Sequence, residues 1–514
     1  MFSKVKSCAV HGVDGRMIDV EADVNDGLPV FTMVGYLSSS VRESSERVRT
    51  ALKNSGFHLP PKRITINLSP ADMRKDGSGY DLAIATAVLL SLGVTAELPM
   101  EQTLVLGELS LDGSIKAIPG VLPMVICARE EGMTSCIVPK ENVQEAALVQ
   151  GISVIGVSSL KETMEYIQGI KEYENTNVEQ PAVDTSEYLY DIDFSDVVGQ
   201  ESIKRGMEIA AAGFHNVLLT GAAGAGKSML AKRLPTILPQ MSFEESLEVT
   251  KIYSVGGMLP PEGGLIHRRP FRAPHHTISE YALIGGGRVP TPGEVSFAHY
   301  GVLFLDELPE FSKPVLEVLR QPLEDRRIRI SRVQASYEFP ADFMFVAAMN
   351  PCPCGNYPDY RRCSCTEQQI RRYQSKVSGP LLDRIDIRME VKGVKQEVLF
   401  SKQKTESSKT IRARVEQARQ MQKDRFAGTG LLFNSQLDGK NLEKYITLSE
   451  EGKRLVLQLF EEQELSVRGV HRVLKLARTI ADLAGSEEIE HAHLQEAAFY
   501  RNQDVFAKEV LYGN

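Results

Sequence analysis

The most constraining feature of this chain is a complete P-loop at residues 221–228, with the sequence GAAGAGKS. The apolar residues 217–219 before it predict a short buried strand, and residues 229–234 after it predict a helix. In such a loop the glycines let the backbone N–H groups turn toward the phosphates of a nucleotide. Lys227 would reach the β- and γ-phosphates, and the Ser228 hydroxyl would bind Mg²⁺. A chance glycine-rich turn would not need a strand and a helix on either side.

The composition indicates a globular protein of several domains. The chain has 514 residues, of which 42% are hydrophobic and 25% charged, enough for about three domains. No apolar run is long enough to span a membrane, and the start lacks the apolar core of a signal peptide, so we expect a cytoplasmic protein without membrane partners. The net charge of −8 excludes a basic DNA-coating protein but not a ring-shaped motor with basic pore loops.

The pattern along the chain predicts an α/β multidomain protein. Residues 1–170 alternate between strand-like and helical segments, which predicts an α/β or α+β domain, and the polar residues 171–192 predict a linker. Residues 193–400 carry the P-loop core, and residues 401–514 are expected to form a helical domain. The expected strands are 64–68, 104–109, 136–138, 302–305 and 343–349. The expected helices are 81–92, 124–131, 409–423, 449–462, 470–483 and 493–500.

A second ATPase signature follows the P-loop. Residues 302–305 are apolar and end in Asp306 and Glu307, the pattern of a Walker B strand. Asp306 would hold Mg²⁺ directly or through water, and Glu307 would orient the attacking water. Asn350 ends another buried strand, where it would contact the γ-phosphate or the water. The alternative for Asn350 is a turn residue before proline.

Two arginines are candidates for contacts to the nucleotide. Arg384 lies between two acids and would either stabilise the transition state across a subunit interface or form a surface ion pair, and its spacing does not separate the two. Arg468, in the helical C-terminal part, could reach the nucleotide from a lid. Arg472 and Arg478 follow it and could instead be salt-bridged surface residues.

Four of the seven cysteines lie within residues 352–365. Four thiolates suit tetrahedral Zn²⁺, although a spacing of one residue is tighter than the usual two. We therefore favour zinc over a set of reduced, partly exposed cysteines. The expected metal ligands are Ser228 and Asp306 for Mg²⁺, and Cys352, Cys354, Cys363 and Cys365 for Zn²⁺.

Two basic segments are candidates for DNA contacts. Residues 267–276 are rich in Arg and His and precede the flexible residues 285–287, and residues 326–332 alternate basic and apolar residues as a strand would. Such loops could follow a phosphate backbone in the pore of a motor. The alternative is a solvated loop or strand, which is the usual role of a charged run.

The order of these motifs is similar to that in AAA+ proteins of the magnesium-chelatase branch, beginning with residues 193–200, whose Val-Gly pair contacts adenine in such modules. The resemblance implies sensor 1 at Asn350, an arginine finger at Arg384 and sensor 2 at Arg468. The residues implied to act in catalysis are Lys227, Asp306, Glu307, Asn350, Arg384 and Arg468. Those implied to bind ATP are Val198, Gly199, Gly221, Gly224, Gly226, Lys227 and Ser228.

Over nearly its full length the chain resembles the ComM/YifB family. The motifs that carry the resemblance are residues 269–279, 285–287, 292–296, 350–355 and 378–384. The resemblance implies a hexameric, ATP-driven DNA helicase that promotes branch migration when incoming DNA is recombined during natural transformation. A chelatase-type motor subunit or a protein-remodelling ATPase is the alternative, because both would share the AAA+ core and the helical C-terminal lid.

The N-terminal domain resembles the Lon-protease/ribosomal-S5-type α+β fold. Lon-type proteases use a serine nucleophile activated by a lysine. Here Gly79 or Tyr80 falls where the serine is expected, and Pro123 follows Gly120-Val121-Leu122 where the lysine is expected. An ATP-dependent protease is therefore disfavoured, and we expect a non-proteolytic scaffold that binds DNA or assists ring assembly.

Overall fold

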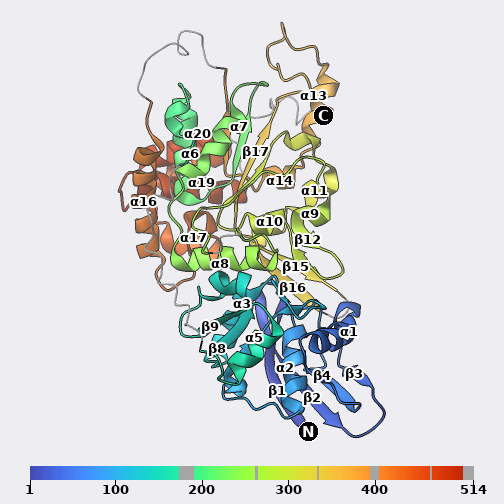
Figure 1. Ribbon diagram of the computed structural model, residues 1–514. Coiled ribbons are helices and arrows are strands. Elements are labelled where there is room, and N and C mark those ends of the chain that lie inside the picture. Colours follow the sequence, from blue (N-terminus) through green and yellow to red (C-terminus); the bar gives the residue numbers. More distant parts are fainter. Residues whose placement is uncertain (173–189, 261–263, 333–334, 394–404, 463–465, 502–514) are drawn as a thin grey trace.

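The computed structural model describes residues 1–172, 190–260, 264–332, 335–393, 405–462 and 466–501. Most of the expected linker lies outside the described residues. So do residues 394–404, where the expected core meets the expected lid, and residues 502–514 at the end of the lid. Figure 1 shows the N-terminal domain in blue and cyan at the bottom, with the ATPase core above it in green and yellow. The C-terminal helices, in orange and red, lie beside the core. Within the described residues, no helix has the length and apolar character needed to cross a membrane.

The N-terminal domain is built on a mixed seven-stranded sheet in the order β3-β4-β2-β1-β5-β8-β9. The long strands β1 and β2 form an antiparallel hairpin, and β1 then pairs in parallel with β5. The strands are β1 (Phe2–His11), β2 (Asp14–Asn25), β3 (Phe31–Val34), β4 (Arg63–Ser69), β5 (Thr103–Val105), β8 (Ser135–Pro139) and β9 (Ser153–Val157). The small strands β6 (Glu108–Leu109) and β7 (Ile115–Lys116) pair separately.

Helices cover both faces of this sheet. The helices α1, α2 and α5 pack on one apolar cluster and α3 and α4 on the other. Their bounds are α1 (Ser39–Asn54), α2 (Asp81–Ser91), α3 (Val121–Glu130), α4 (Val143–Ala146) and α5 (Leu160–Ile167). The prediction of one strand over 104–109 is wrong, because the chain bends at Gly107 with φ +155° and divides it into β5 and β6. A Cβ atom there would lie 3.0 Å from the Ile115 side chain, so the bend requires glycine.

The ATPase core contains a parallel five-stranded sheet in the order β11-β14-β17-β10-β18. These strands are β10 (Val217–Thr220), β11 (Phe271–Arg272), β14 (Val302–Leu305), β17 (Met344–Met349) and β18 (Ile387–Glu390). Because all five run in one direction, their carboxyl ends meet at one edge of the sheet and their amino ends at the other. The strands expected at 302–305 and 343–349 are confirmed.

The sheet is buried on both faces, as expected for a parallel sheet. Alternate residues of the strands belong to two different apolar clusters, so Val217 and Leu219 face one side and Leu218 the other. The core helices are α6 (Glu201–Gly213), α7 (Lys227–Arg233), α8 (Phe243–Val255), α9 (Glu280–Ile284), α10 (Glu294–Phe297), α11 (Lys313–Val318), α12 (Pro322–Asp325), α13 (Glu367–Gln374) and α14 (Gly379–Leu382). Two hairpins accompany them, β12 (Gly285–Gly286) with β13 (Thr291–Pro292), and β15 (Arg327–Ser331) with β16 (Ser336–Pro340).

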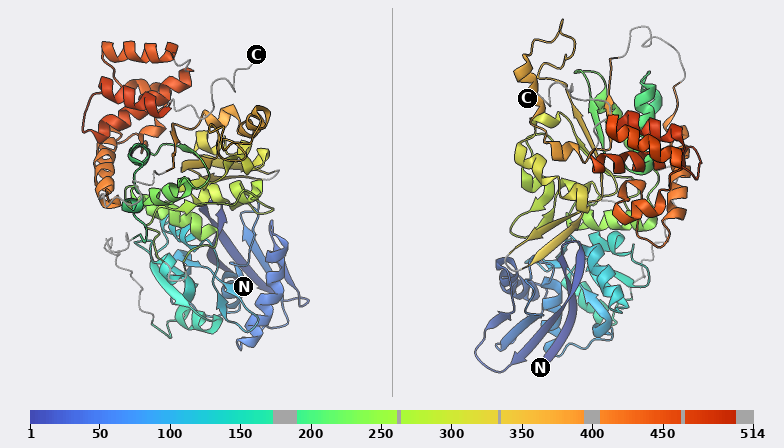
Figure 2. Two further views of the ribbon diagram at one scale, coloured as in Figure 1. Left: turned by 90° about the horizontal axis from the view of Figure 1, so that it is seen from above. Right: turned by 180° about the vertical axis from the view of Figure 1, so that it is seen from behind.

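The C-terminal region is helical, as expected, and packs against α6 on the side of the sheet away from α9–α11 (Figure 2). Its helices are α16 (Ser408–Arg425), α17 (Gly439–Tyr445), α18 (Glu450–Glu462), α19 (Val467–Leu483) and α20 (His491–Arg501). The Ser449 hydroxyl accepts a hydrogen bond from the Gly452 N–H at 3.1 Å, which makes it the N-cap of α18. Gly485, with φ +70°, follows the end of α19.

The N-terminal domain contacts the core at the end of α8, which lies over α3 in Figure 1. The Gly120 N–H donates to the Ser254 carbonyl at 3.0 Å, and the Ser254 hydroxyl donates to the buried Glu145 carboxylate. At the other side of this interface, His11 stacks on Tyr337 of β16 with ring centroids 4.5 Å apart. Between these contacts lies a cleft of roughly 1370 Å³.

Candidate nucleotide-binding site

The P-loop joins β10 to α7 at the carboxyl edge of the core sheet. Gly224 and Gly226 have φ of +76° and +95°, a region that favours glycine. A Cβ atom at Gly221 would lie 2.2 Å from the Val391 carbonyl oxygen, so any larger residue would push the loop away from the sheet. These constraints explain the spacing of the glycines in the motif.

Lys227 has three hydrogen-bond acceptors around its ammonium group. Nζ donates to the carbonyl oxygens of Gly221 at 2.7 Å and Ala222 at 2.8 Å, and to Oδ1 of Asn350 at 3.0 Å. The side chain is buried, with 8% of the residue exposed. Burial lowers the pKa of Lys227 from its usual value, although the carboxylates of Asp306 and Glu307 favour the charged form. The expected P-loop lysine and the expected sensor 1 therefore meet directly.

Ser228 and the Walker B carboxylates lie at the same edge. The Ser228 hydroxyl donates to Oδ2 of Asp306 at 2.5 Å, and the backbone N–H of Glu307 donates to Oδ1 of Asp306 at 2.9 Å. Glu307 adopts φ +52°, an uncommon conformation for a residue with a side chain. A hydroxyl and a carboxylate in contact suit a hard cation such as Mg²⁺, which prefers oxygen ligands.

His276 is a neighbour of this site that the sequence alone does not reveal. Its Nδ1 lies 4.0 Å from Oε2 of Glu307, and its ring contacts those of His275 and Phe311. The local pattern around the two histidines suggests only a basic loop with a structural or DNA-contact role. The tertiary fold is what brings residue 276 to the end of β14, so no local signal could have placed it there.

The segment expected to contact adenine lies beside the P-loop. Arg233, at the end of α7, donates to the Asp193 carbonyl at 2.8 Å and to the Asp196 carboxylate at 2.8 Å. Gly199 has φ +68°, and Gln200 after it donates to the Lys392 carbonyl, next to the Val391 that contacts Gly221. Val198 and Gly199 are thus half-buried between α7 and the end of β18.

Arg384 and Arg468 do not lie with the P-loop. Both line a pocket of about 260 Å³ with Asn216, Asp386 and Phe343, residues that immediately precede the core strands. This pocket is at the amino edge of the sheet, whereas the P-loop is at the carboxyl edge. Strands of 4 to 6 residues separate the two edges by about 13–20 Å. Within one subunit Arg468 therefore lies at the edge opposite the P-loop, and its expected contact with a nucleotide stays a prediction.

The same pocket is lined by charges of both signs: Arg326, His471, Arg472 and Lys475 lie in it, together with the carboxylates of Glu324, Asp342, Asp386 and Asp438. Burial lowers the pKa of Arg472 and Lys475, which means that nearby carboxylates only partly compensate for their loss of water. Nη1 of Arg472 and Nε of Arg384 are buried without a hydrogen-bond partner among the described residues. Arg384 also pairs with the Glu324 carboxylate, so the alternative of an ion pair is present, with Arg384 mostly buried and Glu324 exposed in the wall of this pocket.

Arg472 and Arg478 are not surface residues. Arg472 lies 3.5 Å from the Asp386 carboxylate, and Arg478, with 3% exposed, lies 3.0 Å from that of Asp482. The prediction of exposed salt bridges is wrong for both, because α19 is buried against α6, α16 and α20.

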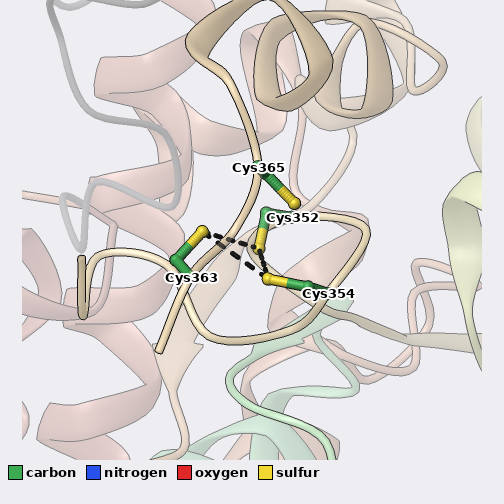
Figure 3. A group of neighbouring side chains, drawn as sticks. All are labelled: Cys352, Cys354, Cys363 and Cys365. Atoms are coloured by element: carbon green, nitrogen blue, oxygen red, sulfur yellow. Dashed lines mark hydrogen bonds between the residues drawn. The ribbon is translucent and has the colours of Figure 1, made fainter. Parts of the chain in front are cut away.

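The four cysteines of residues 352–365 gather into one cluster (Figure 3). All four Sγ atoms lie within 4.8 Å of one another. The separations from Cys352 are 3.4 Å to Cys354 and 3.8 Å to Cys363, and that between Cys354 and Cys363 is 3.5 Å. A disulfide needs about 2.05 Å, so these are free thiols. Tyr357 donates its backbone N–H to Cys352 Sγ at 3.4 Å.

Several of the basic residues expected to contact DNA are paired with acids, two of them in the core and two on an exposed hairpin. Arg269 is buried and lies 3.0 Å from the Glu245 carboxylate, and Arg272 lies 2.6 Å from that of Glu294. Arg327 and Arg329 share one face of β15, as expected, but both pair with Glu338 of β16. Arg269 and Arg272 are therefore engaged within the core, whereas Arg327 and Arg329 form exposed ion pairs on the hairpin, and a DNA contact by these segments stays a prediction.

Two other arginines beside the glycine hairpin are exposed. Arg288 follows Gly287, and Arg332 donates to the Gly287 carbonyl at 3.1 Å. Both line the cleft between the N-terminal domain and the core, together with Arg16, Arg74 and Tyr337.

The region that resembles a protease site opens into the same cleft. Ser78 donates its hydroxyl to the Glu108 carboxylate, and Lys75 is fully buried with Nζ bound to the Pro70 carbonyl. Neither side chain is arranged as a nucleophile or its base. The expectation of a non-proteolytic domain remains a prediction.

Three family models match successive parts of the chain. The family described as "Magnesium chelatase, subunit ChlI" matches residues 193–399, "Subunit ChlI of Mg-chelatase" matches 20–142, and "Magnesium chelatase, subunit ChlI C-terminal" matches 405–501. The core is thus of the magnesium-chelatase AAA+ type. The chain is also 30% identical over 183 residues to Lon protease 2 of Bacillus subtilis, which covers 32% of each chain.

Several relatives match over nearly the whole length. The protein YifB of Escherichia coli is 41% identical over 506 residues, covering 98% of this chain and 97% of YifB. The competence protein ComM of Haemophilus influenzae is 40% identical over 503 residues, covering 97% of each chain. Identity at this level over both entire proteins, together with the shared core, means that the chain belongs to the ComM/YifB family.

Proposed function

We propose that this protein is an ATP-driven motor that acts on DNA, with each ATP bound between two subunits of a ring. The observation that carries the proposal is the division of the expected nucleotide contacts between two opposite edges of one sheet. Lys227, Ser228 and Asp306 form one half-site, and Arg384 with Arg468 forms the other. A single subunit cannot close both halves on one nucleotide, whereas neighbouring subunits can.

Each half-site has a distinct chemical task. Lys227 would exchange its carbonyl acceptors for the β- and γ-phosphate oxygens, and Glu307 would orient and polarise the attacking water. Mg²⁺, held by Ser228 and Asp306, would neutralise charge on the phosphates. Asn350 would hold the γ-phosphate or the water, and the partner's arginines would stabilise the charge that develops in the transition state.

A ring is expected because the proposed contact joins two different surfaces of neighbouring subunits. A carboxyl edge that binds a neighbour's amino edge generates a head-to-tail assembly, which closes when the rotation per subunit allows it. The family resemblance supports six subunits. Light scattering of the protein with ATP and Mg²⁺ would measure the number, and a protein that stays monomeric while hydrolysing ATP would contradict the shared site.

DNA is the proposed substrate on which the motor works. A full-length relative is named a competence protein, which supports a role in the recombination of incoming DNA by branch migration in the cytoplasm. The exposed Arg288 and Arg332 beside the glycine hairpin offer phosphate contacts that Arg269 and Arg272, which are paired with carboxylates of the core, do not. The match to chelatase subunits keeps a chelatase-like or protein-remodelling motor as the second candidate.

Zn²⁺ is the proposed occupant of the four-cysteine cluster. A tetrahedral zinc site with Zn–S bonds of about 2.3 Å has sulfur atoms about 3.8 Å apart. The thiols of Cys352, Cys354 and Cys363 are 3.4, 3.5 and 3.8 Å apart and all four lie within 4.8 Å of one another, so the cluster is near this geometry. The N–H of Tyr357 that points at Cys352 is the kind of contact that stabilises a thiolate ligand.

The function is tested by ATP hydrolysis with and without single-stranded and forked DNA, beside the Arg384→Ala variant. Stimulation by DNA that disappears in the variant is the expected result. Hydrolysis that is indifferent to DNA would contradict the DNA motor and favour the second candidate. Hydrolysis measured with a porphyrin and a metal ion, or with an unfolded protein, in place of DNA would then distinguish a chelatase-like motor from a protein-remodelling motor.

A further inference from the structure

The four-cysteine cluster is continuous with the sensor residue of the nucleotide site. Asn350 directly follows β17, and Cys352, fully buried, comes two residues later. The chain then passes through the other three cysteines and enters α13 two residues after Cys365. A change in the position of this cluster would therefore act on Asn350 through a single intervening residue, Pro351.

The same loop covers the P-loop. Gly355 has φ +81°, and a Cβ atom there would lie 3.3 Å from the backbone nitrogen of Ala223 and 3.9 Å from Cγ of Asn350. Backbone thus packs against backbone at this point, with no side chain between the two loops. The four-cysteine loop is a wall of the nucleotide site and not a separate module.

The far end of the loop returns to its start. Gln374, the last residue of α13 and only 4% exposed, donates Nε2 to the Pro351 carbonyl at 2.9 Å. The Tyr373 hydroxyl contacts the backbone of Asn350. These contacts to Asn350 and Pro351 hold this end of the loop only while α13 stays in position, and α13 begins at Glu367, after its N-cap Thr366, two residues beyond the last cysteine.

A metal ion in the cluster would fix this arrangement. Cys352 and Cys354 lie at the beginning of the loop and Cys363 and Cys365 at its end, so a four-thiolate ion joins the two ends. Joining them reduces the conformational freedom that the loop would otherwise have. The ends are the two points that determine where Asn350 and α13 lie.

We infer that Zn²⁺ bound by Cys352, Cys354, Cys363 and Cys365 is a structural part of the nucleotide site, which positions Asn350 and holds Gly355 against the P-loop. The inference rests on the proposed role of this site in binding ATP, and it makes nucleotide binding and turnover depend on metal occupancy. It does not depend on DNA. None of the four cysteines would touch the nucleotide, so each is a positioning residue.

The first test measures metal content and exchange in the full-length chain. We expect elemental mass spectrometry to find about one Zn²⁺ per chain in the protein as purified. Removal with a thiol reagent and a chelator should increase amide hydrogen exchange both at residues 350–374 and at the P-loop residues 221–226. The affinity for a fluorescent ATP analogue, measured without DNA, should fall about tenfold. Re-addition of Zn²⁺ should restore all three.

Cys363→Ser should reproduce the stripped protein, and Cys127→Ser is the matched control, because Cys127 is a half-buried free thiol in the N-terminal domain. A protein without bound metal would overturn the inference. So would a stripped protein whose P-loop exchange and nucleotide affinity are unchanged. Failure of DNA to stimulate hydrolysis would contradict the proposed function but would leave these readouts unaffected.

A second variant separates the coupling from the metal. Gly355→Val keeps all four thiols but introduces a side chain, at positive φ, where Ala223 lies. We expect the normal metal content with weakened nucleotide binding and increased P-loop exchange. Normal metal content with normal nucleotide binding would show that the contact does not transmit the effect and would overturn the inference, even if Cys363→Ser misfolds.

Discussion

Oδ1 of Asn350 accepts a hydrogen bond from Nζ of Lys227 at 3.0 Å, so the two residues that bracket the γ-phosphate in the proposed site are already in contact. The remaining acceptors of the ammonium group are P-loop carbonyls. Asn350 therefore lies where a phosphate bound by Lys227 would also be within its reach.

Asn350→Ala should lower the rate of ATP turnover by about 100-fold, because the variant lacks a positioned amide that acts on the reacting phosphate or water. The affinity for ATP should change much less, since Lys227 and the P-loop remain. Steady-state kinetics and equilibrium binding would separate these effects. Equal decreases in affinity and turnover would indicate that Asn350 only shapes the pocket.

Glu307→Gln should bind ATP but hydrolyse it very slowly, because the carboxylate that polarises the water is replaced by an amide. Lys227→Ala should lose nucleotide binding or turnover. Glu310→Gln is the control, since Glu310 lies one turn further along, is exposed and lies 3.4 Å from the Lys376 ammonium. If Glu307→Gln kept full turnover, the assignment of the general base would be wrong.

Mixing two inactive variants would test the shared site. Lys227→Ala subunits lack a working P-loop but carry Arg384, and Arg384→Ala subunits are the converse. In a random ring formed from equal amounts, about a quarter of the interfaces would combine both intact halves. We expect hydrolysis to recover on mixing. If the mixture stays inactive although mixed rings have been demonstrated, Arg384 acts in the same subunit that binds the nucleotide.

Removing Arg288 and Arg332 together should weaken DNA binding at physiological salt. The slope of affinity against salt concentration should fall by about one unit for each phosphate that the variant no longer neutralises. The effect should be similar for different DNA sequences, because phosphates carry no sequence information. Arg49→Ala, an exposed arginine of α1 paired with Glu46, is the control for a change in charge alone. An unchanged salt slope would exclude both residues from the DNA path.

Asp386 should stabilise the core in a pH-dependent way. Burial alone would raise the pKa of Asp386, but the hydrogen bond with His215 and the nearby charges of His215, Arg472 and Lys475 bring it well below its usual value. Its contribution is therefore complete above the unfolded-state pKa of about 3.9 and disappears as the pH falls further. Asp386→Ala should lower the free energy of unfolding by about 3 kcal/mol at pH 7, because buried cations lose their partner.

Urea unfolding followed by circular dichroism at several pH values would measure this effect. The difference between the wild type and Asp386→Asn should be constant above about pH 5 and shrink as the pH falls below about 4. Asp26→Asn, an exposed residue beyond the end of β2, should show no such trend. A difference that grows on acidification would mean that the carboxyl group is buried in its neutral form.

The sequence was sufficient for the fold wherever hydrophobic pattern and motif coincide. The strand before the P-loop and the helix at 81–92 are found within a residue or two, because each is set by local apolar pattern. The division of the strand expected at 104–109 was missed because it depends on the approach of Ile115 to Gly107.

The candidate site was less accessible from the sequence. Motifs identify Lys227 and Asp306 because their chemistry is encoded in adjacent residues. The position of Arg468 depends instead on how α19 packs against α6, and the neutralisation of Arg269 depends on Glu245, 24 residues away. The charged run at 267–276 therefore predicted an exposed DNA-binding loop where the fold pairs Arg269 and Arg272 with Glu245 and Glu294.

The hydrogen bonds between Ser254, Gly120 and Glu145 join the N-terminal domain to α8 independently of the chain that connects the two domains. The N-terminal domain and the rest of the protein therefore contact each other as two separate subunits would. Fragments 1–172 and 190–514, produced from separate genes in the same cell, would be expected to purify as one complex.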